Sequence, residues 1–161
     1  MAAYLPYIRI FGADQVQGML HRGELALKDA RAINRKIADD MMRVIKMTFM
    51  GQGRRYGGSW YALDIATVRE KRRKGLDHRI LIARGRLMDS YTKPRSRNQI
   101  LRIDRDSIEL GSRLGYAAIH QFGDEAKGIP ARPFIDFDPR DHARWARIVE
   151  TELMQRMGFT S

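Results

Sequence analysis

Residues 115–137 read GYAAIHQFGDEAKGIPARPFIDF, and this stretch has the least generic pattern in the chain. Its first part predicts a short helix over residues 116–122, in which Tyr116 and His120 share a face because they are four residues apart. Gly123 is expected to end this helix, because glycine tolerates the positive φ that is common just after a helix. The next five residues include both charge signs and end in glycine, which favours a loop exposed to solvent.

Two prolines, Pro130 and Pro133, stiffen the second half of the stretch. Each fixes its own φ and disfavours helical geometry in the residue before it. Because proline cannot donate to a central ladder, we expect residues 133–137 to form a strand at the edge of a sheet. Arg132 is then held on a rigid segment. The plainest interpretation is a packing corner, in which Arg132 caps a carbonyl and His120 is half-buried with its hydrogen bonds satisfied.

The whole chain has 161 residues and is expected to form one domain, because this length is sufficient to bury a core. It contains no cysteine, which excludes disulfides and thiolate sites and suits a protein made in a reducing cytoplasm. No stretch approaches the roughly 20 apolar residues of a membrane span. The amino terminus also lacks the pattern of a signal peptide, so we expect neither secretion nor membrane insertion.

The net charge of +11 is unevenly distributed. Residues 1–50 carry +3, residues 51–105 carry +10 and residues 106–161 carry −2. This asymmetry predicts a local positive potential that attracts polyanions or acidic protein surfaces. Nucleic acid is one possible partner, and an acidic neighbouring subunit is another.

The first half of the chain predicts a strand, a long helix and a basic loop. Residues 7–11 form a β-compatible run between a proline and a glycine. Asp14 is expected to cap a helix over residues 15–49, where apolar residues recur on one side. Four glycines and two arginines in residues 50–59 indicate a flexible basic loop. Residues 69–75, REKRRKG, are expected to form a second flexible basic loop or a solvated helix face, with a functional contact as the alternative.

The second half predicts two further helices and a hairpin. A helix is expected over residues 77–91, and strands over residues 99–104 and 107–112 flank a tight polar turn. Asp138 or Asp141 is expected to cap a final amphipathic helix that ends near Met157. This order of elements predicts an α+β fold, in which a small antiparallel sheet packs with a long N-terminal helix and a C-terminal helix.

The sequence displays no convincing active site. Its four histidines lack metal-ligand spacing, and the adjacent residues Asp39 and Asp40 diverge on a helix surface. The Gly-rich run GQGRRYGG lacks the lysine and hydroxyl pair of a phosphate-binding loop. We therefore expect neither enzyme activity, nor a cofactor, nor a metal site.

Two segments resemble the virion morphogenesis, or tail completion, family of tailed bacteriophages. A tyrosine-alanine pair, a His-Gln-x-Gly turn and Ile-Pro-Ala-Arg-Pro-Phe resemble the carboxy-terminal signature of that family. The matching residues are Tyr116, Ala117, His120, Gln121, Gly123, Ile129, Pro130, Ala131, Arg132, Pro133 and Phe134. A Trp-Leu-Thr stretch before a Leu-x-x-x-Gly-x-Leu helix resembles the central part of the family. Its matching residues are Trp60, Leu63, Thr67, Leu81, Gly85 and Leu87.

The resemblance implies a structural virion protein at the head–tail joint, assembled in the host cytoplasm. It implies a homo-oligomeric ring of six copies, or of twelve, that contacts the connector or stopper and the tail terminator or tail tube. A stand-alone protein that binds nucleic acid non-specifically is the alternative function. The residues expected at the subunit interface are Tyr116, His120, Gln121, Arg132 and Phe134, with the loop 124–128. The residues expected to contact a partner or the DNA in the channel are Arg54, Arg55, Lys71, Arg72, Arg73 and Lys74.

Overall fold

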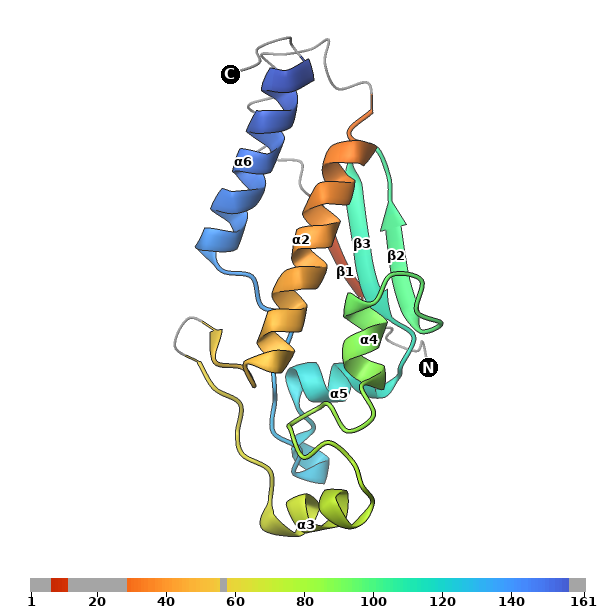
Figure 1. Ribbon diagram of the computed structural model, residues 1–161, viewed down its shortest axis with the longest axis vertical. Helices are drawn as coiled ribbons and strands as arrows, with labels where there is room; N and C mark the ends of the chain where they lie inside the picture. The colour runs from red at the N-terminus through yellow and green to blue at the C-terminus, as the bar shows by residue number, and fades with distance from the viewer. Residues whose placement is uncertain (1–6, 12–28, 56–57, 157–161) are drawn as a thin grey trace. The chain divides into compact units, whose positions relative to one another are not determined.

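The computed structural model describes residues 7–11, 29–55 and 58–156, with only the backbone given for residues 7–11 and 156. It confirms the predicted α+β fold (Figure 1). The strands are β1 (Tyr7–Phe11), β2 (Gln99–Ile103) and β3 (Ser107–Ser112). The helices are α2 (Arg31–Met50), α3 (Ile65–Arg73), α4 (Arg86–Thr92), α5 (Tyr116–Phe122) and α6 (Pro139–Arg156), with a 3-10 turn, η2 (Glu125–Lys127).

The chain divides into two compact units, and four elements continue from one unit into the other. Unit 1 comprises residues 1–7, 42–100 and 111–136, and unit 2 comprises residues 8–41, 101–110 and 137–161. The helix α2 and the strands β1, β2 and β3 each contribute residues to both units. The expectation of one domain stays a prediction.

The three strands form one sheet in the order β1-β3-β2. The predicted hairpin is confirmed, since β2 and β3 pair across a short turn that the backbone N–H of Asp104 closes by donating to the Ser107 carbonyl at 2.9 Å. The predicted first strand is also confirmed, with the bounds that the sequence indicated. The edge strand expected at residues 133–137 is wrong, because this segment is extended without pairing in the sheet. Its backbone bonds instead to side chains described below.

In unit 2, the first part of α2 and the helix α6 lie antiparallel. Asp40 on α2 accepts hydrogen bonds from Arg144, at 2.6 and 2.8 Å, and from the Trp145 indole at 2.8 Å. One end of the pair is further joined by an ion pair between Lys36 and Glu152. These contacts place Trp145 in the core, as its helical spacing predicted.

Asp138 caps α6 as predicted. Its carboxylate accepts from the backbone N–H of Arg140 at 2.7 Å, and Pro139 occupies the first helical position, where no hydrogen bond is lost. Asp141 completes the cap by accepting from the Asp138 N–H at 3.2 Å. The helix therefore begins where the sequence indicated.

The described part of the long N-terminal helix begins at Arg31 and ends at Met50. The cap expected at Asp14 and the helix expected over residues 15–28 lie outside the described residues. Along α2 the predicted apolar side is buried, with Met41, Val44, Ile45 and Phe49 all at most 1% exposed. No helix among the described residues is both long and apolar enough to cross a membrane.

Unit 1 has an aromatic core. The Phe134 ring lies 5.1 Å from both the Phe49 ring and the Tyr91 ring, and Phe49 meets Trp60 edge-to-face at 5.7 Å. The Trp60 indole donates to the Pro133 carbonyl at 2.7 Å. Residues that are distant in the sequence are thus joined by burial and by one directional bond.

Two segments of unit 1 differ from the sequence prediction. Residues 77–85 are not helical, because Asp77 pairs with Ala83 in an isolated bridge and Leu81 has a φ of 59°, so only α4 remains of the helix expected over residues 77–91. The loop expected at residues 69–75 is mostly helix, since α3 extends to Arg73 and is capped by Asp64. Arg69, Arg72 and Arg73 are exposed on this helix, whereas Lys71 is half-buried.

Candidate functional site

The stretch at residues 115–137 folds back on itself, and Gln121 holds its two halves together. The side-chain oxygen of Gln121 accepts from the backbone N–H groups of Phe134 and Ile135, both at 3.1 Å. Its amide nitrogen donates to the Ile135 carbonyl at 3.1 Å. One side chain thus satisfies backbone groups that a strand would have paired, which explains why this segment needs no place in the sheet.

The turn between the halves is built around Gly123. Its φ of 84° ends α5, as predicted, and its Cα lies so close to Ala131 that a β-carbon would come within 2.9 Å of the Ala131 nitrogen. Asp124 and Ile129 then exchange backbone hydrogen bonds at 2.8 and 2.9 Å. The loop 124–128 is therefore fixed at both ends, with Glu125 exposed in η2.

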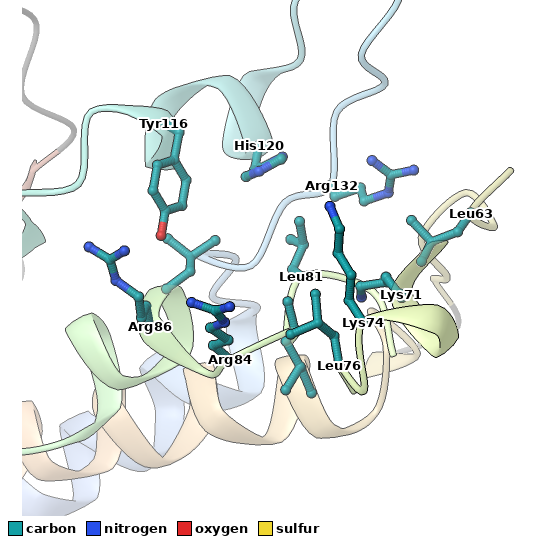
Figure 2. Close-up of a pocket in the computed structure, with 13 residues that line it drawn as sticks. Leu63, Lys71, Lys74, Leu76, Leu81, Arg84, Arg86, Tyr116, His120 and Arg132 are labelled. Atoms are coloured by element: carbon teal, nitrogen blue, oxygen red, sulfur yellow. The ribbon is translucent and has the colours of Figure 1, made fainter. Parts of the chain in front are cut away.

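A pocket of about 480 Å³ lies beside α5 in unit 1. Tyr116 projects from α5 toward Arg84 and Arg86, whereas His120 lies nearer to Arg132 (Figure 2). The apolar lining residues are Leu63, Leu76, Leu81, Ile82, Ala83 and Leu87. The cationic lining residues are Lys71, Lys74, Arg84, Arg86 and Arg132.

Two clamps hold the wall at residues 76–86 in place. The Asp77 carboxylate accepts from the Arg79 backbone N–H at 2.8 Å and from the Arg79 guanidinium at 2.6 Å. Gln52 accepts from the Ile80 N–H at 2.6 Å and donates to the Ile80 carbonyl at 3.3 Å. These bonds replace the helical ladder that this segment lacks and keep Leu81 in the pocket wall.

The pocket has a positive charge that nothing inside it compensates. No carboxylate is among the described residues that line it. Within the described chain, Lys71 and Arg132 form no salt bridge, and each donates instead to a backbone carbonyl: Lys71 to Arg79 at 2.6 Å and Arg132 to Tyr61 at 3.3 Å. Burial lowers the pKa of both side chains.

His120 brings a buried ring nitrogen to the pocket. Its Nδ1 is buried and has no hydrogen-bond partner among the residues that the structure describes. Burial, and secondarily the charge of Arg132, lower the pKa of the imidazole. The packing-corner interpretation is thus confirmed for Arg132, which caps a carbonyl, but is wrong for His120, whose ring is not fully hydrogen-bonded.

The structure brings three of the five expected interface residues together. Tyr116, His120 and Arg132 all line the pocket, whereas Gln121 is engaged with the backbone of its own chain. The expectation that Phe134 lies at a subunit interface is wrong, because this ring is fully buried in the core of unit 1. Arg84 and Arg86 also line the pocket and were not predicted as site residues; their position on either side of Gly85 was the available signal.

The six cations expected to face a channel or partner do not act as one group. Lys71 and Lys74 line the pocket, while Arg54, Arg72 and Arg73 are exposed elsewhere on unit 1 and Arg55 is half-buried. The half-exposed Glu70 pairs with both Arg73, at 2.7 Å, and Lys74, at 2.8 Å. Part of the charge counted in the sequence is thus neutralised locally. In the described ranges, no three potential ligands gather to hold a metal ion.

Comparison with known proteins identifies the family. Residues 12–154 match the profile of the phage virion morphogenesis family. The chain belongs to the phage virion morphogenesis family. Both compact units lie almost wholly within the matched region, so this family assignment covers the whole described fold apart from β1 and the end of α6.

A curated protein of similar length is also similar to the chain. It is the protein named Mu-like prophage FluMu G protein 2 of Haemophilus influenzae, which is 30% identical over 141 residues, or 84% of this chain and 87% of that protein. No solved structure matches the chain significantly. The chain is therefore a virion morphogenesis protein of a bacteriophage, as the two sequence segments indicated.

Proposed function

We propose that this virion morphogenesis protein is a structural subunit at the head–tail joint, where identical copies form a ring that completes the tail or neck. The observation that carries the proposal is the family match over residues 12–154, which spans both compact units. Because the match extends over nearly all of the chain, we assign a structural role in the virion to the chain as a whole. The proposed role involves no catalysis, and its partners are the connector or stopper on one side and the tail on the other.

The surface of unit 1 supports self-association. Tyr61, Ile65 and Phe122 are large apolar side chains with exposed fractions of 72%, 69% and 75%. Exposed apolar side chains of this size are stabilised when a neighbouring protein covers them. A closed ring of six or twelve copies would cover them repeatedly.

Electron microscopy of phage particles that lack the protein tests the proposal. A nonsense codon in its gene, in an inducible prophage, should yield filled capsids and separate tails, and supplying the protein from a plasmid should restore joined particles. Joined, infectious particles without the protein would refute the proposal. Native mass spectrometry of the purified full chain should show a discrete multimer.

DNA contact is the second candidate function, and the exposed arginines of α3 favour it. Arg69 and Arg72 are exposed and form no ion pair within the described residues. Such side chains can bind phosphates without reading bases. A filter-binding assay with duplex DNA in rising salt distinguishes this activity, because phosphate binding falls steeply with salt.

A further inference from the structure

We infer that the pocket beside α5 receives Phe122 and the adjoining acidic turn of a second copy of the same chain, in a head-to-tail contact. This inference rests on the proposed ring and specifies the contact that builds it. Three properties of unit 1 support it: the composition of the pocket, the composition of the exposed turn, and the positions of both on α5.

The pocket composition selects a ligand that is both apolar and anionic. Leucine and isoleucine side chains form its apolar part, so a phosphate group alone would leave that surface uncovered. Arg84, Arg86 and Arg132 lie around the same space, and no lining carboxylate neutralises them. A large apolar side chain next to a carboxylate satisfies both requirements, and the carboxylate can accept bidentate hydrogen bonds from a guanidinium.

The turn after α5 offers such a ligand. Phe122 is 75% exposed, which makes it the most exposed large apolar side chain among the described residues. Glu125 follows three positions later, is exposed and has no salt bridge in the described chain. Asp124 is already paired with Lys127 at 2.8 Å, so the free negative charge of the turn comes from Glu125.

The helix α5 places ligand and pocket on opposite sides. Tyr116 and His120 are four residues apart and both line the pocket. Phe122 is two residues beyond His120, which is a rotation of roughly 200° around the helix axis. A chain therefore cannot insert its own Phe122 into its own pocket. Pairing of two different surfaces is a heterologous contact, which generates a ring when the rotation closes.

Two defective variants and their mixture test the inference. Phe122→Ala removes the inserted side chain, whereas the double variant R84E/R86E removes the cationic side of the pocket. All three residues are exposed, so folding should be retained, as circular dichroism and thermal unfolding would check. Each variant alone should associate about 30-fold more weakly than the native chain, which is the loss expected for an interface anchor.

Mixing the two variants should restore one contact. The double variant still carries Phe122, and Phe122→Ala still has an intact pocket, so the mixture should form heterodimers that do not grow further. Native mass spectrometry distinguishes this result from larger multimers. The control is Met154→Ala, which removes another exposed apolar side chain and should assemble like the native chain. Normal assembly of Phe122→Ala, or absence of heterodimers from the mixture, would overturn the inference.

The same variants in phage separate this inference from the proposed function. If the null phage fails to join heads and tails but Phe122→Ala phage joins them normally, the ring stands and this contact is wrong. If the null phage itself joins normally, the proposed function fails. Binding of a duplex DNA oligonucleotide that R84E/R86E abolishes, with assembly independent of Phe122, would assign the pocket to DNA and overturn the inference.

Discussion

Gly123 and Gly115 bracket α5 and provide a matched test of the turn. Gly123 has a φ of 84°, and a β-carbon there would lie 2.9 Å from the Ala131 nitrogen and 3.0 Å from the Ile129 oxygen. Gly115 has a helical φ of −57° and open space around it. Gly123→Ala should therefore lower the free energy of unfolding by about 1–3 kcal/mol, whereas Gly115→Ala should leave it nearly unchanged. Urea denaturation measures both, and equal effects would contradict the expected strain.

The role of Gly123 was predictable from the sequence because a local rule governs it. The roles of Gln121 and Phe134 were not, because they depend on which backbone and which rings come close in the folded chain. Phe134 follows a proline and looks like a strand residue, yet it packs against Phe49 and Tyr91. Its partners lie more than 40 residues away in the sequence, and no periodicity connects them.

The start of α6 depends on Asp138. Its carboxylate accepts from the Arg140 N–H at 2.7 Å, which satisfies a backbone donor that the helix leaves unpaired. Asp138→Ala should lower the free energy of unfolding by about 1 kcal/mol. Asp136→Ala is the control, because Asp136 is exposed just before the cap and should contribute little. Thermal unfolding of the two variants measures the difference, and equal stabilities would show that the cap contributes nothing.

The contribution of the pocket wall at residues 76–86 to stability should decrease at low pH. The Arg79 guanidinium and backbone N–H hold the pKa of Asp77 at about 2, below its usual value of 3.8. Because the folded pKa is the lower one, the stabilisation is fully present above pH 3.8 and is lost as the pH falls through about 2. The native chain should therefore exceed D77N in stability at pH 5, and this advantage should shrink toward pH 2. An advantage that does not change with pH would contradict the assignment.

Hairpin and terminal helices were predictable, whereas the segment before α4 was not. The strands β2 and β3 flank a polar turn and the helix α6 has a clear cap, so local rules determine their bounds. Residues 77–91 have helical apolar spacing, but Asp77 bonds to Arg79 and Gln52 binds Ile80, which favours a turn over the first helical bonds. A local bond at Asp77 and a tertiary bond from Gln52 thus override a periodicity that was correct only from Arg86 onward.

The structure shows where the positively charged side chains of the described residues lie. The sequence assigns +10 to residues 51–105, but it cannot show which cations converge. The fold distributes them: Arg73 pairs with Glu70 outside the pocket, while Arg84 and Arg86 join Arg132 from a distant segment around it. An acidic protein surface or DNA remained equally compatible with the net charge alone. The apolar side chains between these cations favour the protein surface.

Salt dependence of self-association distinguishes the two partners. In the proposed contact, the Glu125 carboxylate binds a few guanidinium groups and the Phe122 ring is buried. Salt screens the ionic interaction but not the burial of the ring. Raising NaCl from about 50 to about 200 mM should weaken assembly of the native chain by only about ten-fold or less, as measured by sedimentation velocity. Binding that neutralises several phosphates would fall by about 1,000-fold or more over the same range. E125Q should assemble more weakly than the native chain and with a flatter salt response, because it keeps Phe122 and loses the charge. If assembly of the native chain does not depend on salt and E125Q assembles equally well, the ionic contact between Glu125 and the pocket is excluded.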